Sequence, residues 1–143
     1  MVSGAEKAQL KVDRMGSWVD YAEPLLMPSM RDPLFGIQSV RNMVEEGTAT
    51  LFVIYLVANG EDRPVGAFVV TVNHYDFGSE AVVVVASGHL PGVNMTRLLF
   101  PVIEQEFSSC TRVRILASRK GMVRNLERLG FKAVEINMIK EIR

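Results

Sequence analysis

Four consecutive valines at positions 82–85 constrain the fold of this chain more than any other feature of its sequence. Valine favours strands, and a strand covered on only one face would alternate apolar with polar residues. The segment 81–86 contains no polar residue, so it predicts a strand that is covered on both faces. Such a strand needs neighbouring strands on each side and helices above and below the sheet.

The residues before the valines predict two antiparallel neighbours. We expect strands at 51–57, 65–72 and 81–86, joined by turns at 59–64 and 74–79. The strands are rich in β-branched and aromatic residues, and Asn59-Gly60 is a hairpin signal. Because both connections are short, the three strands should run antiparallel to one another.

A different connection follows the valines. We expect a glycine-rich turn at 87–92, a helix at 93–107, a strand at 113–117, a helix at 122–129 and a final strand at 131–142. Gly130 is well placed to end the last helix in a left-handed conformation. A helix between two neighbouring strands makes them parallel, so the sheet should be mixed but mostly antiparallel.

The N-terminal part should supply the helices for the other face of the sheet. We expect a weak strand at 8–12, a helix that carries Trp18, Tyr21, Leu25 and Leu26, and a second helix at 33–46. Pro24 and Pro28 should shorten or kink the first of these helices. Asp32 is a candidate N-cap for the second helix, because Asp can cap a helix start and the Pro33 that follows it suits the first helical position. The sequence thus predicts one α/β domain over residues 1–143.

Composition excludes several classes of function. The 143 residues carry 16 basic and 16 acidic side chains, so there is no electrostatic case for nucleic acid or for an anionic membrane surface. Cys110 is the only cysteine, which excludes an internal disulfide, and no Cys/His cluster has zinc spacing. The polar segment 1–11 lacks the apolar core of a secretion signal, so we expect a cytoplasmic protein without a membrane span.

The late helix carries a family resemblance. Residues 125–131 read Asn-Leu-Glu-Arg-Leu-Gly-Phe, which resembles the Leu-Tyr-Glu-Lys-Leu-Gly-Phe commonly found in the GNAT (GCN5-related N-acetyltransferase) superfamily. The order of elements over roughly 35–143 is also similar to the GNAT order. The resemblance implies an acyl-CoA-dependent N-acyltransferase with acetyl-CoA as its cofactor and an unidentified amine as its acceptor. It also implies a mixed sheet with helices on both faces.

In GNAT proteins the turn after the central strand holds the pyrophosphate of acetyl-CoA on backbone amides at a helix N-terminus. The resemblance implies that role here for His89, Gly92, Val93, Asn94, Met95, Thr96 and Arg97. His89 and Asn94 depart from the family pattern of Gln/Arg and Gly/Ala, and a turn that merely links strand to helix is the alternative. Backbone amides of Val84, Val85 and Ala86 would polarise the thioester carbonyl.

The catalytic positions of the family are changed. Leu126 stands where many GNAT enzymes place a tyrosine that protonates the leaving thiolate. Arg119 is closest to the position of a family asparagine, where with Ser118 and Lys120 it could instead face phosphate. The valine strand contains no acid to serve as a base, because Glu80 stands only at its start. No residue is therefore assigned to catalysis.

Two alternatives remain open on the sequence alone. The first is a non-catalytic GNAT-like structural or interaction protein that binds a protein partner, because phage-encoded GNAT-like virion proteins also carry a leucine at the tyrosine position. If it is phage-encoded, such a protein would be associated with the virion, and a homo-oligomer is compatible with either function. The second concerns His74, Tyr75 and Asp76, which could perform acid–base chemistry or simply form a turn.

Overall fold

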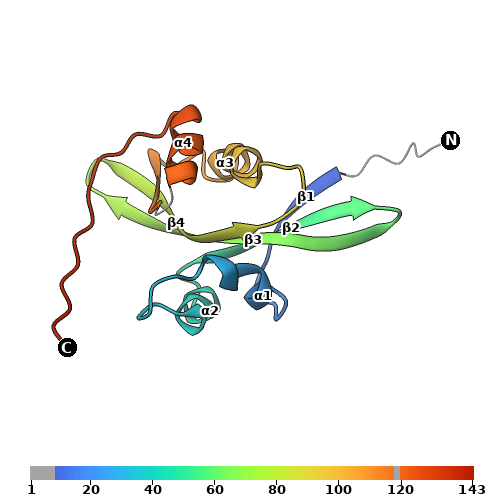
Figure 1. Cartoon of the computed structure of the whole chain (residues 1–143), viewed down its shortest axis with the longest axis horizontal. Coiled ribbons are helices and arrows are strands. Elements are labelled where there is room, and N and C mark those ends of the chain that lie inside the picture. The colour runs from blue at the N-terminus through green and yellow to red at the C-terminus, as the bar shows by residue number, and fades with distance from the viewer. Residues whose placement is uncertain (1–8, 118–119) are drawn as a thin grey trace.

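A five-stranded sheet organises the computed structural model, which describes residues 9–117 and 120–143. Its strands are β1 (Gln9–Arg14), β2 (Thr50–Ala58), β3 (Glu61–Tyr75), β4 (Gly78–Gly88) and β5 (Arg112–Ile115). They lie in the order β1-β2-β3-β4-β5, antiparallel except for the parallel pair β4–β5 (Figure 1). The predicted mixed, mostly antiparallel sheet is confirmed, and the valine strand β4 has a neighbour on each side.

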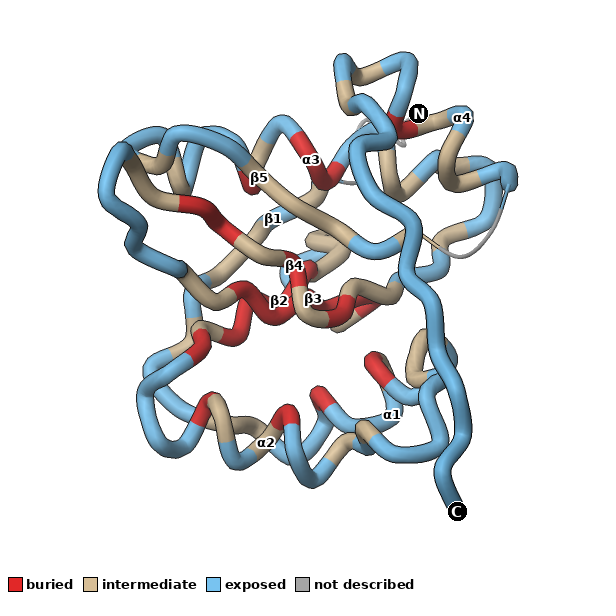
Figure 2. Tube along the Cα trace, turned by 90° about the vertical axis from the view of Figure 1, so that its left-hand side faces the viewer, coloured by how far each residue is buried: buried red, intermediate tan, exposed pale blue. Residues whose placement is uncertain are grey.

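Helices cover both faces of this sheet (Figure 2). They are α1 (Ala22–Leu26), the 3₁₀ turn η1 (Met27–Ser29), α2 (Ile37–Glu45), α3 (Met95–Glu106) and α4 (Lys120–Arg128). One core cluster joins the sheet to α3 and α4, with Phe100, Ile103 and Leu126 among its members. The other joins the opposite face to α1 and α2, through residues such as Leu26 and Val40. Within the described residues, no helix has the length and apolar character needed to cross a membrane.

Local signals explain most element boundaries. Asn59 and Gly60 have φ values of 52° and 75°, the paired left-handed conformation of a two-residue hairpin turn. Gly130 has a φ of 96° and follows α4 as expected. Pro24 and Pro28 coincide with a five-residue α1 that passes into η1. Pro101, by contrast, is accommodated within α3.

Three predicted boundaries were wrong. The segment 61–64 belongs to β3 rather than to a turn, because the two-residue turn lets strand pairing resume at Glu61. The turn between β3 and β4 is only Asp76-Phe77. The helix predicted at 33–46 begins at Ile37 with Gly36 as its N-cap, because the Asp32 carboxylate instead accepts a hydrogen bond from the Leu34 amide at 2.9 Å, which closes a local turn.

The predicted final strand at 131–142 was also wrong. The structure shows no strand in 131–143, and every residue from Lys132 onward is exposed. A strand needs a partner strand. This segment instead crosses the edge of the sheet, from the α3–α4 side to the α1–α2 side, and does not run along β5 (Figures 1 and 2). The predicted strand at 8–12 is found as β1, although Ala8 lies outside the described residues.

Candidate functional site

The centre of the valine run carries a β-bulge. In the pairing of β3 with β4, Val69 lies opposite Val85 and Val70 opposite Val83, so Val84 has no partner in β3. The extra residue reverses the alternation of side chains: Val83 packs in the α3–α4 core, whereas Val85 packs in the α1–α2 core. Bulges of this kind re-aim the backbone and are common beside active sites.

The sheet opens at the same place. β5 pairs with β4 only from Glu80 to Val83, whereas β4 continues beside β3 as far as Gly88. Val84, Val85 and Ala86 therefore have no strand on their β5 side within the described residues. Backbone donors and acceptors that lack a strand partner need another partner, which a bound ligand can provide.

The turn from β4 to α3 leads from this opening to a helix N-terminus. Gly92 has a φ of 77°, a left-handed conformation that most side chains disfavour. The Val93 amide is already engaged, since it donates to the Leu90 carbonyl at 3.1 Å. The His89 amide likewise donates to the Val65 carbonyl at 3.0 Å, while the imidazole is on an exposed residue.

Asn94 caps α3. Its side-chain oxygen accepts a hydrogen bond from the Arg97 amide at 3.1 Å, which is the ordinary N-cap geometry. Within the described residues, the amides of Asn94, Met95 and Thr96 have no hydrogen-bond partner. A 12-residue helix also carries partial positive charge at this end. The turn therefore offers free amides in a setting that suits an anion such as phosphate.

One contact, which links the N-terminus of α3 to α4, was not predicted from the sequence. The Asn94 side-chain nitrogen lies 3.4 Å from the side-chain oxygen of Asn125 on α4. The next residue, Leu126, is buried in the α3–α4 core and also lines the groove between β5, α4 and the segment after α4. Asn125 is thus a side chain of α4 that contacts the N-cap residue of α3. Ser118 and Arg119 lie outside the described residues.

Glu80 is a buried acid at the other end of β4. Its Oε2 accepts hydrogen bonds from the Nε atoms of Arg112 at 2.5 Å and Arg114 at 3.0 Å, and only 1% of the residue is exposed. Burial alone would raise the pKa of this carboxyl, but the two guanidinium groups outweigh it and the pKa is lowered. Glu80 also precedes Val84 by four residues, or about 13 Å along a strand. It therefore holds β4 to β5 and is remote from the bulge.

Replacing Glu80 by glutamine should reduce the loss of folding stability that occurs when the pH is lowered. Because the folded pKa is depressed, the charge stabilises the fold above the ordinary value of 4.5, and this stabilisation is lost as pH falls through the folded pKa. At neutral pH we expect Glu80→Gln to lower the free energy of unfolding by about 1–3 kcal/mol. Urea unfolding at neutral and at acidic pH measures both effects.

The matched control for this prediction is Glu135→Gln. Glu135 also pairs with Arg114, but its side chain is 62% exposed, and an exposed ion pair contributes about 0–1 kcal/mol. A Glu80→Gln variant that loses stability on acidification in parallel with the wild type would show that other carboxylates cause the loss.

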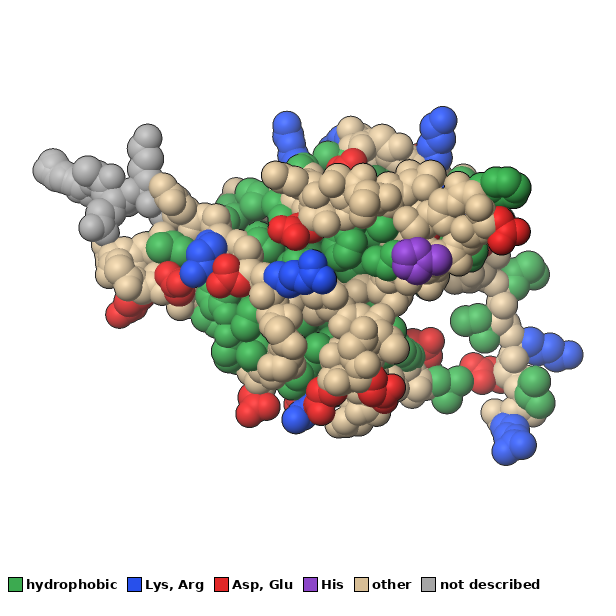
Figure 3. Space-filling view, turned by 180° about the vertical axis from the view of Figure 1, so that it is seen from behind, with side chains coloured by type: hydrophobic (Ala, Val, Ile, Leu, Met, Phe, Trp, Pro, Cys, Tyr) green, Lys and Arg blue, Asp and Glu red, His purple; other side chains and the backbone are tan. Residues whose placement is uncertain are grey.

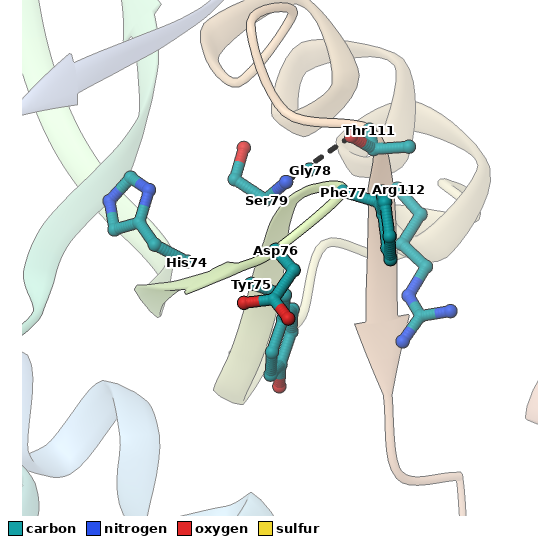
Figure 4. Close-up of a pocket in the computed structure, with 8 residues that line it drawn as sticks. All are labelled: His74, Tyr75, Asp76, Phe77, Gly78, Ser79, Thr111 and Arg112. Atoms are coloured by element: carbon teal, nitrogen blue, oxygen red, sulfur yellow. Dashed lines mark hydrogen bonds between the residues drawn. The ribbon is translucent and has the colours of Figure 1, made fainter.

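The His74, Tyr75 and Asp76 side chains do not form a converging catalytic group. They lie at the tip of the β3–β4 hairpin, beside a hollow of about 530 Å³ (Figure 4). Figure 4 shows His74 directed away from Tyr75 and Asp76. The hairpin is joined to the start of β5 by a hydrogen bond from the Ser79 amide to the Thr111 hydroxyl at 3.2 Å. Among the described residues, no group of His, Cys, Asp and Glu is arranged to hold a metal ion.

The arrangement of strands and helices is similar to solved structures of acetyltransferases. A structure described as a probable acetyltransferase matches with a TM-score of 0.67 at 12% identity, over 93% of this chain and 98% of the other. The aminoglycoside acetyltransferase meta-AAC0020 from an uncultured soil metagenomic sample matches with a TM-score of 0.66 at 10% identity, over 94% and 97%. Glucosamine-6-phosphate N-acetyltransferase from Arabidopsis thaliana matches with a TM-score of 0.61 at 13% identity, over 94% and 99%.

These likenesses extend over nearly the whole of each chain, but their identities are low, so they show the fold alone. No protein-family model matches the sequence, and neither does any curated protein. The features of this chain that bear on chemistry are the bulge, the opening between β4 and β5, and the N-terminus of α3.

Proposed function

We propose that this chain, which has the fold of the GNAT N-acetyltransferases, binds an acyl-CoA at the opening beside Val84 and transfers the acyl group to an amine. The observation that carries the proposal is the coincidence of the bulge with the end of β5 pairing. The end of β5 pairing leaves backbone groups of the central strand β4 without partners on that side. The N-terminus of α3, where an anion is favoured, follows within the next ten or so residues of chain.

The backbone would do most of the binding. Of Val84, Val85 and Ala86, those whose amides point away from β3 would donate to the thioester carbonyl, whose oxygen gains negative charge during attack. The free amides of Asn94, Met95 and Thr96 would hold the pyrophosphate. Val93, whose amide is engaged in the turn, would contribute mainly by shaping the loop.

Three side chains would support this phosphate site. The Thr96 hydroxyl can donate a hydrogen bond to a phosphate oxygen, and Arg97 can add positive charge beside it. Arg97 and His89 are both exposed at the surface next to the turn. His89 would then add a further donor where the family has Gln or Arg.

The transfer would be a direct attack. The amine nitrogen bonds to the thioester carbon, the carbon–sulfur bond breaks, and CoA leaves as the thiolate while the nitrogen carries a positive charge. The proton that the nitrogen then loses neutralises the thiolate through solvent. Leu126 is buried and has no proton to donate, so we expect catalysis to rest on positioning and on the backbone donors, at a modest rate.

Calorimetric titration of the wild type with acetyl-CoA tests the binding step. We expect saturable one-to-one binding that free CoA competes, because the pyrophosphate contacts are common to both ligands. Absence of binding up to millimolar acetyl-CoA would overturn the proposal. With binding established, release of the CoA thiol in the presence of a panel of amines would identify the acceptor class, and no release with any amine would overturn the transfer step.

A further inference from the structure

Two arginine side chains project from β5 on the side of the sheet where α1 and α2 lie. Val113 and Ile115 of β5 pack against the α3–α4 core, so the alternating residues Arg112 and Arg114 point to the opposite face. The Arg112 side chain is 60% exposed and the Arg114 side chain 31%. Both residues line the groove between β5, α4 and the segment after α4, which has a volume of about 1080 Å³. The two guanidinium groups are therefore accessible to a ligand.

The buried carboxylate of Glu80 fixes the direction of both guanidinium groups. Its Oε2 accepts hydrogen bonds from the Nε atoms of Arg112 and Arg114, and its Oε1 accepts one from the Tyr75 hydroxyl at 3.4 Å. Figure 4 shows Tyr75 and Arg112 extending to the same side of the β3–β4 hairpin. Because Glu80 engages only the Nε atoms, the Nη atoms are left for another partner, and among the described residues those of Arg112 have none. Guanidinium N–H groups presented in this way suit carboxylate oxygens.

One carboxylate from outside the sheet already meets this pair. Glu135, on the segment after α4, accepts a hydrogen bond from Nη1 of Arg114 at 3.1 Å, and its side chain is 62% exposed. Every residue of that segment from Lys132 onward is exposed, and Figure 3 shows side chains of the segment standing apart from the body of the molecule. An exposed ion pair of this kind contributes little, so the carboxylate of a ligand can replace that of Glu135.

The charges at this position favour such a replacement. Glu80 and Glu135 together balance the two arginines, so displacement of Glu135 leaves one positive charge for the carboxylate of a ligand. Asp32 lines the same groove, and its carboxylate accepts the hydrogen bond from the Leu34 amide that closes its own turn.

Arg114 also lies close to the opening between β4 and β5. It is paired with Val82, which precedes Val84 by two residues, or roughly 7 Å along the strand. The pairing of the two strands ends at the next pair, Val83 with Ile115. A ligand whose carboxylate is held by the two arginines can therefore extend along β4 and place its other end at the opening.

We propose that the acceptor is an amine that also carries a carboxylate, which Arg112 and Arg114 hold while the amine reaches the opening beside Val84. This inference rests on the proposed acyl transfer. Glu80 is a positioning residue that directs the two guanidinium groups, and Glu135 occupies the place of the carboxylate when no acceptor is bound. The separation along β4 selects amines whose carboxylate is several bonds from the nitrogen, such as ε-aminocaproate, whose extended chain spans about 7 Å.

NMR of the arginine Nε–H groups tests the carboxylate site without acyl-CoA. We expect ε-aminocaproate to shift the signals of Arg112 and Arg114 saturably, and ε-aminocaproamide, which lacks the carboxylate, to shift neither. Arg41 is the internal control, because its Nε binds Glu45 in an exposed pair on α2 outside the groove. Glu135→Gln should tighten binding about two- to fivefold, because the competing carboxylate is removed. Equal shifts at Arg41, no shift at the two arginines, or no tightening in Glu135→Gln would overturn the proposal.

Acyl transfer shows whether the bound carboxylate belongs to the acceptor. We expect the wild type to favour ε-aminocaproate over ε-aminocaproamide by about tenfold or more in kcat/KM, since hydrogen bonds to a charged group are the stronger ones. Arg112→Gln should lower this ratio about threefold or more, mainly through KM, whereas general structural damage would lower kcat/KM for both amines in parallel. Arg41→Gln should keep the wild-type ratio.

The two proposals fail in different ways. Equal transfer to both amines by the wild type would overturn the carboxylate-bearing acceptor and leave the proposed function standing. Absence of acetyl-CoA binding in the calorimetric titration would overturn the proposed function itself.

Discussion

Replacing Gly92 by valine should weaken acetyl-CoA binding by at least about tenfold, which is about 1.4 kcal/mol. Gly92 has a φ of 77°, and a side chain in that conformation costs about 1–2 kcal/mol, more for a β-branched one. No atom lies within 4 Å of the position that a Cβ would take, so crowding is not the cause. The turn should relieve the strain by rotating, which moves the amides of Asn94, Met95 and Thr96 away from the positions that hold phosphate.

Gly47→Val is the matched control for this experiment. Gly47 follows α2 with a φ of 80° and also has no atom within 4 Å of the position that an added Cβ would take, so the conformational cost should be similar. Gly47 is remote in sequence from the turn between β4 and α3, and its variant should lose stability but bind acetyl-CoA like the wild type. Equal weakening in both variants would show that the Gly92 effect is one of global stability, and unchanged binding in Gly92→Val would exclude the turn as the phosphate site.

Gly66→Ala should be strongly destabilising, lowering the free energy of unfolding by about 2–3 kcal/mol. Gly66 lies in β3 directly opposite Gly88 in β4. An added Cβ would lie 2.9 Å from the Ser87 carbonyl oxygen and 3.0 Å from the Gly88 Cα, both of them backbone atoms of β4. Because these backbone atoms pair with β3, they cannot move aside without breaking the end of the β3–β4 ladder, and the strain stays in the folded state.

Urea denaturation measures this loss, with Gly121→Ala as the control. Gly121 lies in α4 and has no atom within 4 Å of an added Cβ, so alanine should leave stability unchanged or raise it by up to about 1 kcal/mol. A Gly66→Ala variant as stable as the wild type would mean that β3 and β4 are not held as closely as the structure shows. The same variant should also disturb the start of the turn after Gly88.

The late helix and the glycines were readable from the sequence. The segment 125–131, together with the valine strand, the glycine-rich turn and the helix upstream of it, predicted the GNAT fold, which the structure and the similar acetyltransferases confirm. Asn59-Gly60 and Gly130 predicted their turn and helix end correctly, because the left-handed conformation depends on the residue itself. The assignment of the β4–α3 turn and its amides to acetyl-CoA remains a prediction.

The sequence alone determined where the central strand lies, since an unbroken apolar run of β-branched residues has few other solutions. The sequence could not determine the bulge at Val84 or the contact of Asn94 with Asn125. Nor could it determine the pairing of Glu80 with Arg112 and Arg114, which lie more than 30 residues further along the chain. These depend on strand register and helix placement, which are set by packing over the whole sheet rather than by neighbouring residues. The segment after α4 shows the same division: its pattern predicted a strand, but in the tertiary structure residues 131–143 pair with no strand.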